Sequence, residues 1–141
     1  MQLKDNFPCR VLLIEDTELD KEIFIRALTT VNPVAKCIHC NNGTEAINFL
    51  KKTDALPGFI FLDLGLPVMN GKECLQEIRK INHCKNIPVT ILSASIDLRD
   101  EKETKQSGAD FYIYKTRHFD ILCDSINLIL GGKKMVIHPV S

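Results

Sequence analysis

The stretch FIFLDLGLP, residues 59–67, sets the frame for interpreting the whole chain. Its four consecutive apolar residues, Phe59 to Leu62, are typical of a short strand that is buried on both faces of a sheet. The run ends on a carboxylate, Asp63, which is followed by Leu-Gly-Leu and Pro67. Acidic side chains are rarely buried without a partner, so an acid at the end of a core strand suggests a specific role.

The composition predicts one globular domain. The chain has 141 residues, of which 45% are hydrophobic and 26% charged, and domains of about this length are typical. The 18 basic and 18 acidic residues cancel, which argues against a chain that binds nucleic acid or an anionic membrane through its overall charge. No apolar run reaches the roughly 20 residues of a membrane helix, and MQLKDNFPCR does not resemble a signal peptide. A cytoplasmic location without membrane attachment is the expectation.

Six cysteines raise the question of a disulfide or zinc site. The suggestive cluster is CIHC, residues 37–40, which lies in a segment with the pattern of a strand. Residues three apart on a strand point to opposite faces, so Cys37 and Cys40 should not share a metal, and the sequence has no second C-x-x-C. Reduced thiols that pack as small apolar groups are the better interpretation.

Hydrophobic periodicity predicts five strands that alternate with five helices. The expected strands are residues 10–15, 34–40, 59–63, 87–93 and 109–115, and the expected helices are residues 17–31, 43–52, 70–81, 96–107 and 118–130. This order predicts an α/β fold, a doubly wound parallel sheet covered by helices on both faces. We expect the domain to span residues 1–131, with its core at about 9–130, and residues 132–141 to be a short C-terminal tail that cannot fold alone.

Several helix details follow from the same patterns. Thr17 is predicted to cap the first helix, and Asn70 with Glu73 is predicted to form a capping box on the third. The apolar stripe of the first helix is expected to contain Leu19, Ile23, Ala27, Leu28 and Val31. The stripe of the fifth helix is expected to contain Phe119, Leu122, Ile126 and Ile129.

Polar residues stand where four of the five strands end. They are Glu15 and Asp16 after the first strand, Asp63 on the third, Ser93 on the fourth and Lys115 on the fifth. Taken singly, Asp16 could be a helix cap, Ser93 a turn residue and Lys115 an edge lysine. In parallel sheets, however, ligands bind outside the carboxyl ends of the strands, where these groups would meet. Clustered carboxylates favour a cation such as Mg²⁺, and a metal with a lysine and a hydroxyl can hold a phosphoryl group.

These motifs resemble those of the response-regulator receiver domain, of the stand-alone chemotaxis-regulator type. The resemblance covers about residues 9–130 and depends on VLLIEDTELD, FIFLDLGLP with NG shortly after, IPVTILSAS and GADFYIYK in this order. It implies a flavodoxin-like sheet with strand order 2-1-3-4-5 and five helices. It also implies a two-component phosphorelay regulator, which takes a phosphoryl group from a sensor histidine kinase or a histidine phosphotransfer protein.

The resemblance implies a role for each matching site residue. Asp63 would be the phosphoacceptor, and Lys115 would pair first with its carboxylate and then with a phosphoryl oxygen. Asp16 and Asp63 would bind Mg²⁺ directly, with the Gly65 carbonyl as a further ligand and Glu15 acting through water.

Two residues would transmit the signal. By the resemblance, the Ser93 hydroxyl would bond to the phosphoryl group and draw in its loop, and Tyr112 would change rotamer with that movement. The output surface would be the face made by the fourth helix, fifth strand and fifth helix. A homodimer would use the same face, with MVIHPV of residues 135–140 adding apolar surface nearby.

Three positions depart from the family pattern. Glu15 stands where aspartate is commoner, and Gly65 replaces the larger side chain often found two residues after the acceptor. Thr116 replaces the proline that usually follows the lysine. A cis bond before a residue other than proline costs about 2.5–4 kcal/mol, so we predict a trans Lys115–Thr116 bond with the lysine still near Asp63.

Other functions are weaker matches to the same residues. A phosphatase of the haloacid-dehalogenase type would carry a second aspartate where this chain has Gly65, and its acidic metal pair would come late in the chain. A flavodoxin-like cofactor binder would need a phosphate-binding loop after the first strand, which here is the acidic EDTELD. A receiver-like docking module that needs no phosphorylation is the stronger alternative, although all five chemical groups are retained.

The short chain also limits the expected output. We expect no enzymatic turnover beyond slow self-dephosphorylation. We also expect no DNA binding, because too few residues follow Leu130 to form a DNA-binding module. The expected output is contact with a downstream protein target. Short regulators with ED at the first strand and LDLxLP at the third also resemble those that serve phytochrome-like histidine kinases.

Overall fold

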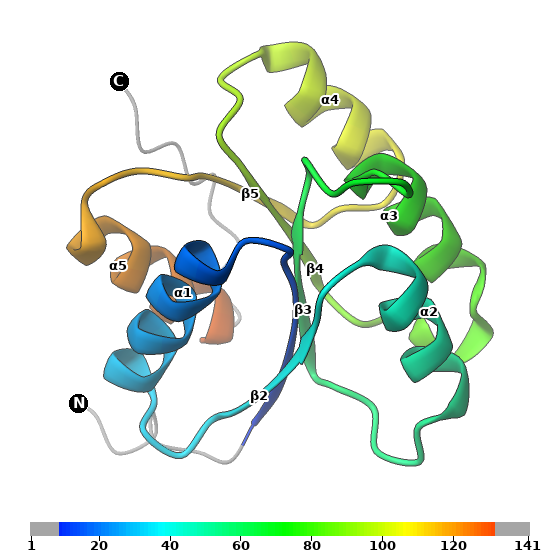
Figure 1. Cartoon of the computed structure of the whole chain (residues 1–141), viewed down its shortest axis with the longest axis horizontal. Coiled ribbons are helices and arrows are strands. Elements are labelled where there is room, and N and C mark those ends of the chain that lie inside the picture. Colours follow the sequence, from blue (N-terminus) through cyan, green and yellow to red (C-terminus); the bar gives the residue numbers. More distant parts are fainter. Residues whose placement is uncertain (1–8, 132–141) are drawn as a thin grey trace.

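The five-stranded parallel sheet predicted from the sequence is the centre of the computed structural model, which describes residues 9–131 (Figure 1). The strands run in the order β2-β1-β3-β4-β5, all parallel. They are β1 (Arg10–Ile14), β2 (Lys36–Cys40), β3 (Phe59–Asp63), β4 (Val89–Ser93) and β5 (Phe111–Tyr114). The helices are α1 (Glu18–Val31), α2 (Gly43–Lys52), α3 (Gly71–Lys80), α4 (Leu98–Gln106) and α5 (Phe119–Leu130), with a short 3₁₀ turn at Asn82–Cys84. The predicted fold class and strand order are confirmed.

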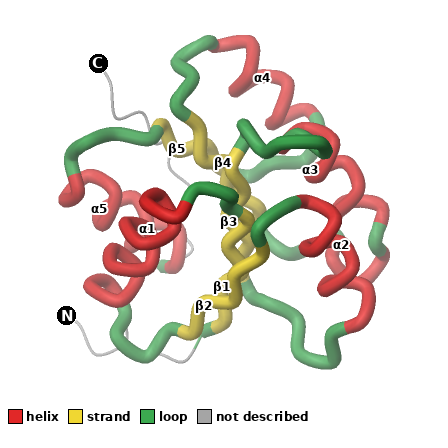
Figure 2. Tube along the Cα trace, in the orientation of Figure 1, coloured by secondary structure: helices red, strands yellow, loops and turns green. Residues whose placement is uncertain are grey.

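Helices cover both faces of the sheet, with α1 and α5 on one side and α2 and α3 on the other (Figure 2). Side chains of β3 alternate between the two cores that result. Ile60 and Leu62 lie in the core shared with α2 and α3, whereas Phe61 lies in the core shared with α1 and α5. Because both faces are covered, β3 is apolar along its length up to Asp63.

Helix caps follow the predictions in part. Asn70 and Glu73 form the predicted capping box at the start of α3. Thr17 does occupy the N-cap position of α1, but its side chain makes no capping hydrogen bond. Its backbone N–H donates to the Glu15 carboxylate at 3.3 Å, which links the start of α1 to the end of β1.

The predicted buried stripe of α1 was wrong at two positions. Leu19 is 63% exposed and Ile23 is 38% exposed. Phe24 is buried instead and packs on Phe61, with ring centroids 4.8 Å apart. The buried stripe therefore runs along Phe24, Ala27 and Leu28, and helical spacing continues it toward position 20 rather than 19.

In α5, too, an apolar residue that was predicted to be buried is partly exposed. Phe119 at its first position is 37% exposed, whereas Ile126 and Ile129 are buried as predicted. Two of the three misplaced apolar residues, Leu19 and Phe119, lie in the first turn of a helix. These first turns lie toward the carboxyl edge of the sheet, where less core remains to cover them.

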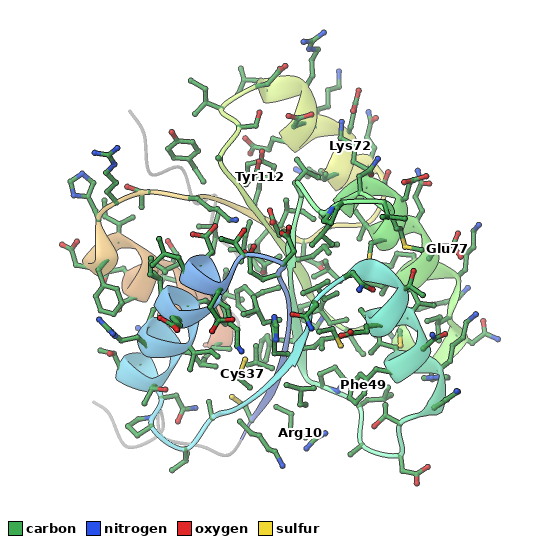
Figure 3. The ribbon with its side chains drawn as sticks, in the orientation of Figure 1. Arg10, Cys37, Phe49, Lys72, Glu77 and Tyr112 are labelled. Atoms are coloured by element: carbon green, nitrogen blue, oxygen red, sulfur yellow. The ribbon has the colours of Figure 1, made fainter. Side chains whose placement is uncertain are left out.

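The thiols of Cys37 and Cys40 lie on opposite sides of β2, as the spacing predicts. Cys37 packs against the core with α1 and α5 (Figure 3), and Cys40 is buried in the core with α2 and α3. Burial raises the pKa of each thiol to about 11. Such neutral thiols act as small apolar groups.

Among residues 9–131, no helix combines the length and apolar character needed to cross a bilayer.

Candidate phosphoryl-transfer site

The carboxyl ends of the strands bring the predicted polar residues together. Glu15 follows β1, Asp63 and Ser93 are the last residues of β3 and β4, and Lys115 follows β5. Parallel pairing sets Asp63 opposite Leu92 and Ser93 opposite Tyr114, so these strand ends lie side by side. Functional side chains on strand ends are held more rigidly than side chains on long loops.

Three carboxylates form the acidic part of the site. One oxygen from each of Glu15, Asp16 and Asp63 lies within 4.8 Å of the others. Glu15 and Asp63 are buried, at 1% and 6% exposure, whereas Asp16 is exposed. Burial raises the pKa of Glu15 to about 7; the Lys115 ammonium opposes this rise, and the nearby Asp63 charge adds to it. Bringing a cation to these carboxylates would relieve their repulsion.

The donor set fits a hard divalent cation. All three side chains offer carboxylate oxygens, and one of them is open to solvent, so water could complete the coordination. Mg²⁺ keeps several waters and takes one or two carboxylates in such sites. No sulfur or imidazole ligand takes part in this group of described residues.

Lys115 reaches the carboxylates from β5, as predicted. Its Nζ lies 3.3 Å from Asp63 Oδ1 and 3.1 Å from Glu15 Oε1. The bond between Lys115 and Thr116 is trans, which confirms the other half of that prediction. Burial lowers the pKa of Lys115, but a hydrogen bond to Asp20 and the charges of Glu15 and Asp63 outweigh burial and raise the pKa overall.

Asp20 is a site residue that the sequence interpretation missed. Its Oδ2 accepts a hydrogen bond from Lys115 Nζ at 2.9 Å, which is shorter than the contacts of Lys115 with the two other acids. The available signal was its position four residues before Phe24 on the buried stripe of α1.

The backbone after Asp63 is fixed by two close contacts. The Gly65 N–H donates to Asp63 Oδ1 at 3.1 Å, and the Gly71 N–H donates to the Leu64 carbonyl at 3.0 Å. A Cβ at Gly71 would lie 2.5 Å from Leu64 Cα and 2.7 Å from the Asp63 carbonyl oxygen. Glycine is therefore required where α3 begins, because the helix starts directly against the backbone of the acid.

Ser93 and Tyr112, the two predicted switch residues, both contact Ser95. The Ser95 N–H donates to Ser93 Oγ at 2.9 Å, and the Tyr112 hydroxyl donates to the Ser95 carbonyl at 3.1 Å. The Ser95 hydroxyl in turn donates to Asp100 on α4 at 2.7 Å. A short chain of hydrogen bonds thus joins the end of β4 to β5 and α4.

A cavity of about 450 Å³ opens beside Asp63. Its lining includes Ser93, Lys115 and, on the outer side, Lys72 and Asp100. Lys72 on α3 pairs with Asp100 at 2.9 Å and with Glu103, so its ammonium bridges α3 and α4 at the rim (Figure 3). The cavity leaves the Asp63 carboxylate accessible from solvent, with the Lys115 ammonium and the Ser93 hydroxyl beside it.

The sequence matches one protein family over most of its length. Residues 11–127 match the family described as the response regulator receiver domain. The response regulator Rcp1 of Synechocystis sp. strain PCC 6803 is 30% identical over an alignment of 146 residues, gaps included, which covers 100% of this chain and 97% of Rcp1. The sensor histidine kinase CheAY of Helicobacter pylori is 30% identical over 105 residues, which cover 74% of this chain but only 13% of that kinase.

Solved structures give the same result. The phosphorylated cyanobacterial phytochrome response regulator RcpA superposes with a TM-score of 0.78 at 28% identity, over 87% of this chain and 91% of RcpA. The Mn²⁺-bound form of Rcp1 superposes with a TM-score of 0.76 at 27% identity, over 95% of this chain and 98% of Rcp1.

Proposed function

Because this chain belongs to the response regulator receiver domain family, it serves as a phosphoacceptor in two-component signalling, and we propose that Asp63 accepts the phosphoryl group. The observation that carries this assignment is the position of Asp63. Its buried carboxylate ends the central strand, opens on the cavity and lies 3.3 Å from the Lys115 ammonium.

The proposed reaction is transfer from a phosphohistidine of a histidine kinase or phosphotransfer protein. A carboxylate oxygen of Asp63 attacks phosphorus, an O–P bond forms and the P–N bond breaks. The imidazole leaves with the electron pair of that bond and takes a proton from solvent. Lys115 faces the oxygens of the transferred group, and Ser93 turns its hydroxyl from Ser95 toward one of them.

We propose Mg²⁺ as the cation of this site. Asp16 and Asp63 would bind it directly, the Gly65 carbonyl would be a third protein ligand, and Glu15 would act through water. Bound Mg²⁺ supplies positive charge that offsets the repulsion between the carboxylates and the phosphoryl oxygens. The Mn²⁺-bound form of the relative Rcp1 supports a divalent cation in such a domain.

Phosphorylation should therefore require the metal. We expect incubation with acetyl phosphate and Mg²⁺ to add one phosphoryl group, and excess EDTA to slow this labelling at least about tenfold, since charge at the transferring group is then uncompensated. Intact-mass spectrometry measures both rates. Excess Mg²⁺ added back to the EDTA sample should restore the original rate, and labelling that EDTA leaves undiminished would contradict the proposed site.

The proposed output is a change on the face of α4, β5 and α5. The hydrogen bonds that join Ser93, Ser95 and Tyr112 support this proposal. If Ser93 turns toward a phosphoryl group, it gives up its bond from the Ser95 N–H, and the segment that holds Tyr112 can then move. We expect beryllofluoride with Mg²⁺ to change amide hydrogen exchange in α4 and β5 but not in α2. Hydrogen-exchange mass spectrometry measures this, and a change confined to α2 and α3 would contradict it.

The partners are proposed from the relatives. A phytochrome-type sensor histidine kinase is the donor we propose, because RcpA is a phytochrome response regulator. Output would pass by contact with a downstream protein rather than by DNA binding or enzymatic turnover. A homodimer on the α4–β5–α5 face remains a proposal, and the segment MVIHPV expected beside it lies outside the described residues.

A phosphotransfer profile tests the partner assignment. The chain is incubated in turn with each phosphorylated histidine kinase of its own genome, and the phytochrome-type kinase should transfer fastest. Equal transfer from all kinases would contradict that choice of donor. Absence of transfer from any kinase, together with no labelling by acetyl phosphate, would favour the docking module that needs no phosphorylation.

A further inference from the structure

Asp20 lies on the first turn of α1, and its carboxylate reaches Lys115 at the site. Its Oδ2 is 2.9 Å from Lys115 Nζ, although the two residues are 95 positions apart in the sequence. Both side chains are half-buried, at 36% exposure for Asp20 and 25% for Lys115. Ion pairs at this depth are less screened by solvent than surface pairs, so the contact can fix the position of the lysine.

Three acids share one ammonium group. Lys115 Nζ has three N–H donors, and it lies within 3.3 Å of carboxylate oxygens from Glu15, Asp20 and Asp63. The Asp20 contact is the shortest and the Asp63 contact the longest. The ammonium is therefore nearest to the carboxylate on α1, while it still pairs with Asp63 Oδ1 at 3.3 Å.

We propose that Asp20 is a positioning residue that holds the Lys115 ammonium to the side of Asp63, where it leaves the attacking oxygen open and faces the incoming phosphoryl group. This inference rests on the proposed function of Asp63. Asp20 does not belong to the three carboxylates that could hold a cation, so it can keep its contact with the lysine while the metal site is filled. During transfer, the N–H groups that faced Glu15 and Asp63 become available to phosphoryl oxygens, whereas the N–H that faces Asp20 stays bound.

Loss of Asp20 should have a defined consequence. An ammonium with one partner fewer pairs more closely with Glu15 and Asp63, and a tight ion pair on Asp63 weakens the nucleophile and covers it. A Lys115 ammonium that has moved from its position is also poorly oriented to bind the oxygens of the transferring phosphoryl group, which slows the transfer. The expected effect is slower phosphorylation rather than loss of fold.

The experiment measures the rate of labelling by acetyl phosphate with saturating Mg²⁺. We expect Asp20→Ala to slow labelling about tenfold and Asp20→Asn, which keeps an oxygen acceptor without charge, about threefold. Glu22→Gln is the matched control, because it removes an exposed carboxylate from the same helix, and it should stay within about twofold of wild type. Thermal unfolding of each variant shows whether it is folded.

A second background separates positioning from other effects. If Asp20 acts through the lysine, Asp20→Ala should change the rate less than about twofold when Lys115 is already alanine. An equal slowing in both backgrounds would overturn the inference, as would wild-type or faster labelling of Asp20→Ala and Asp20→Asn. Faster labelling would mean that Asp20 only repels the phosphoryl donor. Failure of the wild type itself to label would overturn the proposed function, and this inference with it.

Discussion

Replacing Asp63 by asparagine should slow labelling by acetyl phosphate by at least about a hundredfold. An amide oxygen is a far weaker nucleophile than a carboxylate oxygen, and it also weakens binding of the cation. The substitution is nearly isosteric, and the side-chain oxygen can still accept the hydrogen bond from the Gly65 N–H. The fold should therefore survive, and intact-mass spectrometry of wild type and variant under the same conditions measures the loss.

The matched control is Asp54→Asn, which changes an exposed aspartate in the loop between α2 and β3. It should label at the wild-type rate, because Asp54 lies outside the site. Labelling of Asp63→Asn as fast as wild type would show that another group accepts the phosphoryl. Peptide mapping would then identify that group, and the assignment of Asp63 would be wrong.

Most of the fold could be predicted because the buried strands leave a clear pattern. A parallel strand with both faces covered is apolar throughout, and β3 and β4 stand out as FIFLD and VTILS. Polar residues at the strand ends could be combined into one site because parallel strands share an edge. Glu15, Asp63, Ser93 and Lys115 meet there for that reason.

The misses arise where tertiary packing overrides a local pattern. Leu19 continues an apolar spacing on α1, but it lies beyond the core and is exposed. One position later, Asp20 lies on the line of the buried stripe and reaches Lys115. Its spacing of four from Phe24 is the one local feature that distinguishes this acid from its exposed neighbours Glu18 and Glu22, and its partner lies 95 residues away.

Arg79 is a second residue whose role depends on distant segments. It lies in the last turn of α3, where a basic residue is common and is usually solvated. Its guanidinium instead donates to the carbonyls of Gly108 at 2.8 Å and Ile87 at 2.9 Å, and to Asp110 Oδ2 at 3.1 Å. It thereby joins the segment before β4 to the turn between α4 and β5, at the end of the sheet opposite the candidate site.

We expect Arg79→Met to lower the free energy of unfolding by about 3 kcal/mol. Methionine keeps much of the apolar stem but removes every donor, so the part-buried carbonyls of Gly108 and Ile87 lose their bonds from Arg79. Asp110 keeps its bond from the Val89 N–H at 2.9 Å but loses its neutralising charge. Labelling of Asp63 should stay near the wild-type rate, because no group of the site contacts Arg79.

Urea denaturation followed by far-ultraviolet circular dichroism measures this loss, since the chain has no tryptophan to report unfolding by fluorescence. Arg26→Met is the control: it removes an exposed arginine from α1 and should change the free energy of unfolding by less than about 0.5 kcal/mol. Arg79→Lys separates charge from geometry, because a single ammonium cannot reach several carbonyls in different directions as the planar guanidinium does. It should recover less than half of the loss. Full recovery by lysine would mean that the charge opposite Asp110, rather than the set of hydrogen bonds, stabilises this end of the sheet. A wild-type unfolding midpoint for Arg79→Met would mean that solvent replaces the guanidinium with no net loss of stability.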